Sequence, residues 1–246
     1  MMLEPTISKL NQLKLYGIVE ALSEQNQSTM YAELSFEERL GLLVDREITA
    51  RDNRRLTNLL RGARLRYSNA CTEEIDFRTP RGLAKDVIIS LAQNGWVKGK
   101  QNVIITGPTG TGKTFMACAL ANSACRSGHS AYYVRLPRLL QEMNIARGDG
   151  SYGKLLTRIA KYVLLVIDDW GLAKLSEKER RDLLEILEDR HGISSTIIAS
   201  QIPTDKWHDI IGDPTIADAV LDRLVHNAHM IALKGESMRK LMSKNK

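Results

Sequence analysis

The sequence has little of what secreted and membrane proteins are rich in. Its three cysteines, Cys71, Cys118 and Cys125, form no Cys-x-x-Cys pair, so we expect reduced thiols rather than a disulfide framework. No apolar run approaches the roughly 18 residues that a membrane-spanning helix needs. The first residues also lack the basic-then-apolar order of a secretion signal. These absences predict a cytoplasmic protein with no membrane partner.

Aromatic residues are also scarce, which narrows the binding chemistry. Phe, Trp and Tyr make up 5% of the 246 residues, and we find neither an aromatic platform for single-stranded nucleic acid nor a zinc-finger spacing. His226 and His229 lie three apart but straddle a predicted helix end, so a structural role is favoured over a metal site. The apolar content of 43% predicts a globular protein, and the net charge of +6 favours an anionic partner.

A glycine-rich segment follows the short apolar run 103–106. Residues 107–114 read Gly-Pro-Thr-Gly-Thr-Gly-Lys-Thr, the spacing of a phosphate-binding P-loop, although a plain glycine-rich turn is the alternative. Lys113 is placed to reach the β- and γ-phosphates of ATP, and the Thr114 hydroxyl to ligate Mg²⁺. A helix predicted from Lys113 to Arg126 directs its positive end at the anion. The residues expected to contact the nucleotide are Gly107, Pro108, Thr109, Gly110, Thr111, Gly112, Lys113, Thr114 and Phe115.

Two carboxylates end the most apolar run of the chain. Residues 162–167 predict a strand buried on both faces, and Asp168 and Asp169 follow it. In P-loop enzymes, one acid at this position holds Mg²⁺ and a second orients and deprotonates the attacking water. We therefore assign Asp168 to the metal and Asp169 to catalysis as the base, the alternative being two aspartates in a strand-ending turn.

Further polar residues follow the later strands. Ser200 and Gln201 end a predicted strand at 196–200, where either side chain can bond the γ-phosphate or the attacking water; an ordinary polar strand end is equally consistent. Arg223 lies on a predicted helix before the last strand. From there it can reach the γ-phosphate of a neighbouring subunit, although spacing alone favours a surface ion pair.

The order of these patterns predicts an α/β fold with a five-stranded, mainly parallel sheet. We expect strands near 102–106, 131–135, 162–167, 196–200 and 229–233, with helices between them. One of those helices begins at the capping box Ser176–Glu179. Another is expected to start at Thr79-Pro80.

The segment before Asp76 is helical in pattern, without strand signals. Leu10, Leu13, Ile18 and Leu22 suit one amphipathic helix, and Ser35 begins a second that continues or restarts through residue 66. With a linker over 67–79, we predict a small helical DNA-binding domain, 1–70, before an ATPase domain, 71–246.

Arginines are concentrated between residues 46 and 66, where Glu47 and Asp52 are the only acids. Arginine forms forked bonds to phosphate that lysine cannot form, so the cluster favours the backbone of duplex DNA over a solvated face. A weaker basic group lies between the second and third strands. The candidate DNA contacts are Arg46, Arg51, Arg54, Arg55, Arg61, Arg64 and Arg66, followed by Arg138, Arg147 and Lys154.

Taken together, these segments resemble the IstB family, the ATP-binding helper proteins of insertion sequences. The resemblance rests on the P-loop and, more specifically, on Ala199-Ser200-Gln201-Ile202-Pro203 and on the stretch 235–240, which reads Gly-Glu-Ser-Met-Arg-Lys. It implies an AAA+ ATPase of the initiator and helicase-loader clade that binds duplex DNA with ATP, forms homo-oligomers and recruits or activates a transposase. It also implies that Arg223 is the arginine finger and that the region between strands two and three is an extra helical insertion.

The sequence departs from the AAA+ pattern in one feature and is also compatible with three other functions. Only 13 residues follow Leu233, too few for a full helical lid, so a lid-borne role of Arg239 is in doubt. The closest rival is a replicative-helicase loader, which shares the ATPase core. A small-molecule kinase and a nucleotide-switched scaffold with negligible turnover are more distant alternatives.

Overall fold

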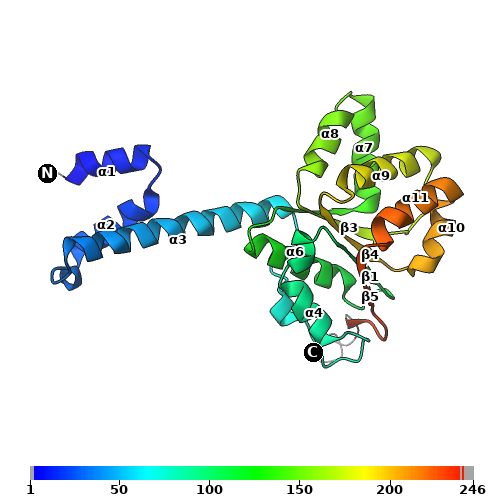
Figure 1. The fold of residues 1–246 in the computed structure, drawn as a ribbon, viewed down its shortest axis with the longest axis horizontal. Coiled ribbons are helices and arrows are strands. Elements are labelled where there is room, and N and C mark those ends of the chain that lie inside the picture. The colour runs from blue at the N-terminus through cyan, green and yellow to red at the C-terminus, as the bar shows by residue number, and fades with distance from the viewer. Residues whose placement is uncertain (1–2, 239, 241–246) are drawn as a thin grey trace. The chain divides into compact units, whose positions relative to one another are not determined.

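The computed structural model describes residues 3–238 and residue 240, and the chain divides into two compact units after Asn58 (Figure 1). The predicted domain boundary after residue 70 falls beyond this division. Helix α3, Phe36–Ala63, is continuous across the point of division, and the chain leaves it at Arg64, whose φ is +51°.

The N-terminal unit contains three α-helices in the described range 3–58. They are α1 (Leu3–Gln12), α2 (Tyr16–Gln27) and the first part of α3, with a short 3₁₀ turn at Thr29–Tyr31. The prediction of one helix through Leu10 and Leu22 was wrong, because the chain turns at Lys14, whose φ is +58°. The start of α3 was predicted correctly: the Ser35 N–H donates to Glu38 Oε2 at 2.8 Å and the Glu38 N–H donates back to Ser35 Oγ at 3.3 Å.

A buried carboxylate joins α2 to α3. Glu47, with a side chain 7% exposed, accepts the N–H groups of Gly17 at 2.7 Å and Ile18 at 3.3 Å, which lie in the first turn of α2. Arg51 donates to the other carboxylate oxygen at 2.7 Å. A Cβ on Gly17 would lie 2.8 Å from the Arg46 carbonyl oxygen, so the two helices cross closely only because residue 17 is glycine.

The second unit is built on a five-stranded parallel sheet in the order β2-β3-β4-β1-β5. The parallel sheet is confirmed, and the first two strands have the predicted bounds. The third begins and ends later than predicted, so that it includes both aspartates. The strands are β1 (Asn102–Thr106), β2 (Ala131–Arg135), β3 (Leu164–Trp170), β4 (Ser195–Ser200) and β5 (Ala228–Ala232).

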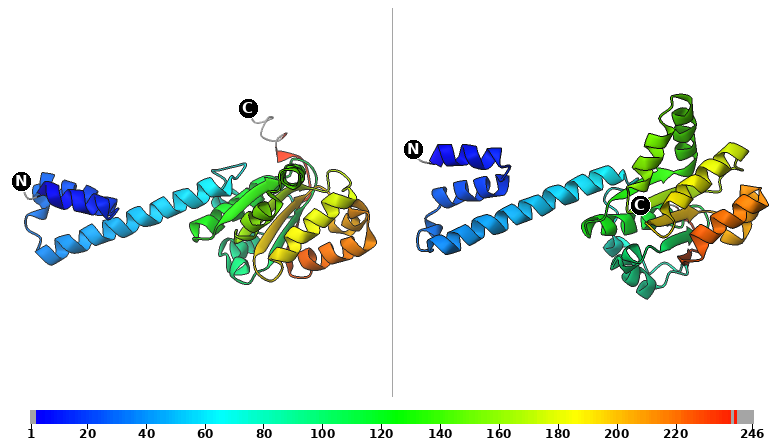
Figure 2. Two further views of the ribbon diagram at one scale, coloured as in Figure 1. Left: turned by 90° about the horizontal axis from the view of Figure 1, so that it is seen from above. Right: turned by 45° about the horizontal axis from the view of Figure 1, so that its top comes forward.

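Helices cover both faces of this sheet, as Figures 1 and 2 show. Helix α6 (Lys113–Arg126), which has its predicted bounds, lies against one face and packs on α4 (Lys85–Ala92). The other face is covered mainly by α7 (Leu136–Gly148), α8 (Tyr152–Ala160), α9 (Glu177–Arg190) and α11 (Pro214–Val225). The remaining short helices are α5 (Gly95–Lys98), α10 (Trp207–Ile211) and the 3₁₀ turns Thr72–Glu74 and Thr204–Lys206.

Two local predictions had different outcomes. The capping box at Ser176 is confirmed, since its hydroxyl accepts the Glu179 N–H and Glu179 bonds back. The helix predicted from Thr79-Pro80 was wrong: α4 begins only at Lys85, because Gly82 takes a φ of +69° and the Thr79 hydroxyl is bound to Asp76. Among the helices described, none is long and apolar enough to cross a membrane.

Candidate nucleotide site

The P-loop lies between the carboxyl end of β1 and the start of α6. Gly107 has a φ of +146°, and a Cβ there would lie 2.4 Å from the Leu233 carbonyl oxygen; a Cβ on Gly110 would lie 2.1 Å from Ser237 Oγ. Only glycine fits at these positions, so the backbone of the loop can approach residues 233 and 237, and a bound anion, without a Cβ in the way. Lys113 Nζ donates to the Pro108 carbonyl at 2.8 Å, so the lysine folds back over the loop. This cradle suits the phosphates of ATP.

Asp168 is held beside the P-loop by three donors. Its side chain is buried, and Oδ2 accepts the Thr114 hydroxyl at 2.9 Å and the Tyr133 hydroxyl at 2.7 Å. Oδ1 accepts the Asp169 N–H at 2.9 Å. A hydroxyl and a carboxylate side by side form the oxygen donor set that Mg²⁺ prefers, so Thr114 and Asp168 fit the metal predicted from the sequence.

Tyr133 was not singled out in the sequence, because its partnership with Asp168 joins two neighbouring strands. Burial, followed by the hydrogen bond to Asp168, raises the pKa of Tyr133 well above its ordinary value, so the phenol remains a hydrogen-bond donor at any physiological pH. Arg66 lies near the same phenol, and its guanidinium carbon lies 5.9 Å from the centroid of the Tyr67 ring. The aromatic pair Tyr132-Tyr133 in a predicted strand was the available signal.

Asp169 has an unusual backbone conformation for a non-glycine residue. Its φ is +59°, and the register between β3 and β4 shifts between Ile167 and Trp170. Such a conformation costs about 1–3 kcal/mol and is found most often at functional sites. The carboxylate forms an ion pair with Arg135, the last residue of β2, which sequence reasoning missed.

Ser200 and Gln201, the two candidate residues at the end of β4, have different surroundings in the structure. The Ser200 hydroxyl is fully buried and lies 3.0 Å from the carbonyl oxygens of Trp170 and Ile202, so it is engaged with the backbone. Gln201 is exposed, and its Oε1 accepts the Thr109 hydroxyl of the P-loop at 2.7 Å. The geometry therefore favours Gln201 over Ser200 as a side chain that senses bound phosphate.

A buried arginine that the sequence did not reveal supports the tip of the P-loop. Arg81 is 5% exposed, and its guanidinium donates to the Thr111 carbonyl at 2.9 Å and to the Asp76 carbonyl. Burial lowers the pKa of Arg81. Phe115 lies in the first turn of α6, and its ring contacts Tyr67 with the centroids 6.0 Å apart.

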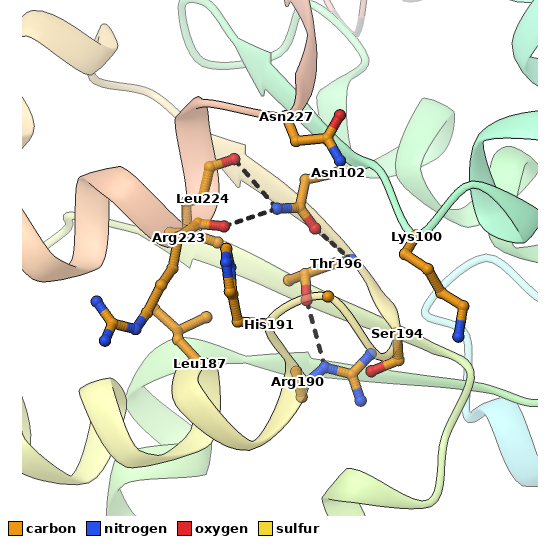
Figure 3. A pocket seen from close by; sticks show the side chains of 11 residues that line it. Lys100, Asn102, Leu187, Arg190, His191, Ser194, Thr196, Arg223, Leu224 and Asn227 are labelled. Carbon is orange, nitrogen blue, oxygen red and sulfur yellow. Dashed lines mark hydrogen bonds between the residues drawn. The ribbon is translucent and has the colours of Figure 1, made fainter.

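Arg223 lies at the opposite edge of the sheet from the P-loop of its own chain. Its carbonyl accepts Asn102 Nδ2 at 3.0 Å, and Asn102 is the first residue of β1, whereas the P-loop follows the last. The guanidinium pairs with Glu188 at 2.7 Å. Arg223 lines a cavity of about 250 Å³. Lys100, Asn102 and Arg190 line the same cavity (Figure 3). Arg223 therefore cannot serve the nucleotide of its own chain.

The arginines of the 46–66 stretch do not form one uniform surface. Arg46 pairs with Glu24 at 3.0 Å, and Arg51 and Arg54 both approach Glu47. Arg64 lies over the Tyr132 ring, with 6.0 Å between the guanidinium carbon and the ring centroid. Arg55 and Arg61 are exposed on α3. Several of these arginines thus stabilise the fold, whatever else they bind.

The second basic group is divided in the same way. Arg138 is 75% exposed and lies 3.4 Å from Glu142, and Lys154 is exposed on α8. Arg147 instead pairs with the buried Asp182 and lies over the Tyr152 ring at 3.7 Å. Its role is to join α7 to α9.

The C-terminal stretch returns to the P-loop. The Met238 N–H donates to the Gly110 carbonyl at 2.9 Å, and Lys240 follows within the same segment. Arg239, whose lid-borne role the short C-terminal stretch puts in doubt, lies outside the described residues. The stretch 235–238 therefore belongs to the surroundings of the nucleotide site.

Comparison of the sequence with known proteins gives one consistent result. Residues 8–246 match the family described as IstB-like ATP binding protein. The Sinorhizobium fredii protein y4pL is 48% identical over 240 residues, which is 98% of each chain, and its name refers to an insertion sequence and to ATP binding. The IS1162 protein of Pseudomonas fluorescens is 50% identical over 204 residues, or 83% of this chain and 88% of that one; the IS21 protein of Pseudomonas aeruginosa is 31% identical over 237 residues, 96% and 88%.

Solved structures agree on the fold. A crystal structure of DnaI has a TM-score of 0.59 at 21% identity, over 72% of this chain and 93% of that one. The DnaC helicase loader has a TM-score of 0.57 at 20% identity, over 69% and 99%. The initiator DnaA, bound to AMPPCP and single-stranded DNA, has a TM-score of 0.56 at 16% identity, over 72% and 54%. At these identities the likeness shows a shared fold.

Proposed function

The chain belongs to the family of IstB-like ATP-binding proteins, and we propose that it is an ATP-dependent, duplex-DNA-binding helper ATPase of transposition. In this role it oligomerises on DNA and recruits or activates a partner transposase. One observation carries the proposal: a P-loop, the Thr114–Asp168 pair and Asp169 lie together at one edge of the sheet, in a chain whose relatives are named for insertion sequences.

The ATPase chemistry follows from the placement of these side chains. Lys113 binds the β- and γ-phosphates, and Thr114 and Asp168 would hold Mg²⁺, which offsets phosphate charge when bound. Asp169 takes the proton of the attacking water while the γ-phosphoryl group passes to that water, leaving ADP and phosphate. To act as a base, Asp169 must exchange its ion pair with Arg135 for the water. Gln201, already bonded to Thr109, orients the water or the γ-phosphate.

Hydrolysis by this arrangement requires a second subunit. Arg223 lies at the far edge of its own sheet, so its guanidinium can stabilise a transferring phosphoryl group only on a neighbour. Arginine fingers of this kind contribute roughly 10³–10⁵ in rate where they have been measured in other NTPases. We therefore propose a nucleotide-dependent homo-oligomer as the active form.

The DNA contacts that we propose are mostly to phosphate. Arg55 and Arg61 are among the proposed contacts, since both side chains are exposed on α3. Arg51 and Arg54 have side chains 57% and 43% exposed and can add phosphate bonds without leaving Glu47. An oligomer aligns many such weak contacts and gains avidity, so ATP tightens binding through assembly. Target choice then comes from DNA shape or from the transposase.

The experiment that tests this function measures DNA binding and particle size together. Duplex and single-stranded DNA of unrelated sequences are each titrated with ATP, ADP or no nucleotide. We expect tighter binding to duplex, with ATP increasing both affinity and particle size. A clear preference for single strands, with no change of particle size on adding ATP, would contradict the proposal and favour a helicase loader.

A further inference from the structure

We infer that Tyr133 is a positioning residue that orients Asp168 toward Mg²⁺, with Arg66 holding Tyr133 in turn. The inference rests on the proposed role of Asp168 as the metal-side acid. It adds two residues outside the P-loop and the aspartate pair to the nucleotide site.

Strand register explains how Tyr133 reaches the carboxylate. In the parallel pair of β2 and β3, Tyr133 is opposite Val166 and Arg135 is opposite Asp168. The long phenol spans the two-residue offset, and its hydroxyl donates to Asp168 Oδ2 at 2.7 Å. Both side chains are buried, so no solvent competes freely for this bond.

The bond fixes the orientation of the carboxylate. Oδ2 also accepts the Thr114 hydroxyl, which belongs to the proposed metal site, whereas Oδ1 is held by the Asp169 N–H. Without the Tyr133 hydroxyl, Asp168 would lose one of the two donors that keep Oδ2 beside Thr114. Hydrogen bonds to a metal-ligating carboxylate of this kind commonly change metal affinity by about 10–100-fold.

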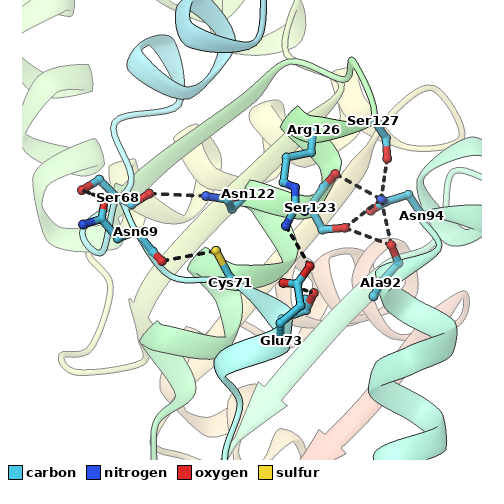
Figure 4. A network of polar contacts seen from close by, with 11 residues as sticks. Ser68, Asn69, Cys71, Glu73, Ala92, Asn94, Asn122, Ser123, Arg126 and Ser127 are labelled. Carbon is cyan, nitrogen blue, oxygen red and sulfur yellow. Dashed lines mark hydrogen bonds and ion pairs between the residues drawn. The ribbon is translucent and has the colours of Figure 1, made fainter. Parts of the chain in front are cut away.

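Arg66 is the cation placed to support Tyr133. Its guanidinium carbon lies 5.9 Å from the centroid of the adjacent Tyr67 ring, near the Tyr133 phenol, whose oxygen can accept from a guanidinium while its hydroxyl donates to the carboxylate. The segment after Arg66 is fastened to α6: Asn122 Nδ2 donates to the Ser68 carbonyl at 3.3 Å and Arg126 pairs with Glu73 at 2.9 Å (Figure 4). The Tyr67 ring also packs on Phe115. Arg66 is therefore placed by the same helix that begins at the P-loop.

The test measures binding of AMPPCP, a non-hydrolysable ATP analogue, by calorimetry over a series of Mg²⁺ concentrations. For Tyr133→Phe we expect unchanged AMPPCP affinity in EDTA and about a tenfold rise in the Mg²⁺ concentration that half-saturates the Mg²⁺-dependent part of binding. Turnover should fall at limiting Mg²⁺ and recover largely at high Mg²⁺, with little change in the KM for ATP at saturating Mg²⁺. Arg66→Gln should shift the Mg²⁺ dependence in the same direction by less.

Tyr132→Phe is the matched control, because it removes the same atom from the adjacent residue of β2. The Tyr132 ring stacks on Tyr162 at 5.1 Å, on the other face of the sheet. Its Mg²⁺ dependence should equal that of the wild type. Equal AMPPCP affinity in EDTA for both variants shows that their P-loops are folded.

Asp168→Asn distinguishes a failure of the positioning role of Tyr133 from a failure of the metal assignment of Asp168. If Asp168→Asn shifts the Mg²⁺ dependence but Tyr133→Phe behaves like Tyr132→Phe, the positioning role is wrong and the proposed site stands. If Asp168→Asn also leaves the Mg²⁺ dependence unchanged, the metal assignment itself is wrong.

Discussion

The two units of the chain are stabilised internally by different kinds of interaction. Among residues 4–58, whose burial the structure describes, only Gly17, Ala21, Gln25 and Glu47 are buried, and large apolar side chains such as Met30 remain exposed. In the second unit, all five residues of β1 are buried, and a continuous apolar cluster fills one face of the sheet. The N-terminal helices therefore depend on a carboxylate and its hydrogen bonds, and the ATPase unit on apolar area.

This difference determines where substitutions can change ATP hydrolysis or DNA binding without unfolding a unit. A large core tolerates changes at its edge, so single catalytic residues at the strand ends can be replaced without unfolding the ATPase unit. The N-terminal unit has little core to spare, and some of its arginines serve both the fold and the proposed DNA contacts. If the two units are separable, changes at the strand ends should alter turnover and changes on α3 should alter DNA binding, each without the other.

The largest effect should come from Arg223. Arg223→Ala should keep ATP binding and lower turnover by about 10³-fold or more, because the neighbouring phosphoryl group loses its cation. Mixing Arg223→Ala with Lys113→Ala protein should restore part of the turnover, since some interfaces then pair an intact P-loop with an intact arginine. ATPase rates across mixing ratios check this. Absence of rescue in confirmed mixed assemblies would show that Arg223 does not act between subunits.

A smaller loss of turnover is expected for Asp169→Asn. The amide cannot accept the proton of the water, so hydrolysis should fall roughly 10²–10⁴-fold while ATP and DNA binding persist. Single-turnover hydrolysis, measured beside nucleotide and DNA binding, checks the prediction. Asp205→Asn, a change at an exposed residue of the turn after β4, is the control. Normal turnover in Asp169→Asn protein would return the role of base to another residue.

The DNA contacts should be alterable without damage to the ATPase unit. Replacing Arg55 and Arg61 by Ala should weaken duplex binding about equally on unrelated sequences and flatten the log–log salt slope by up to roughly two units, at about 0.9 per phosphate. ATP hydrolysis without DNA should be unchanged. Salt titrations with Arg181→Ala as the control check this; its side chain is 70% exposed on α9. Identical slopes in all three proteins would remove Arg55 and Arg61 from the DNA interface.

The smallest effect concerns acid stability of the N-terminal unit. The hydrogen bond from Arg51 is the largest cause that holds the pKa of Glu47 below its ordinary value of 4.5. A depressed pKa stabilises the folded state above pH 4.5, and this stabilisation is lost as the pH falls through the folded-state pKa. Hydrogen exchange should show α2 opening first as the pH falls below 4.5.

Glu47→Gln should lower protection of α2 at neutral pH by about tenfold, since hydrogen bonds to the charge are lost. Glu24→Gln, which removes only an exposed ion pair with Arg46, should leave it unchanged. Equal protection in both variants would show that the carboxylate does not hold these helices.

Local patterns explain how much was predictable. The P-loop, α6 and the five strands were predicted well because glycine spacing and continuous apolar runs are local features. The partners Tyr133, Arg135 and Arg81 were not predicted, because each contact joins residues 30 or more positions apart. Glu47 was noted only as an acid among arginines, since its partners Gly17 and Ile18 carry no side-chain signal. The break at Lys14 was missed because apolar spacing continues through it.

The two ends of β1 give any assembly a direction. The P-loop follows Thr106, whereas the carbonyl of Arg223 is bonded to Asn102, so an interface that pairs one end with the other is head-to-tail. In an open chain of subunits, one terminal P-loop then has no arginine opposite it, and the arginine at the other terminus faces no nucleotide. In a closed ring there is no terminal subunit, so every P-loop has an arginine opposite it. The fraction of bound ATP that hydrolyses slowly would therefore report whether the assembly is open, and how long it is.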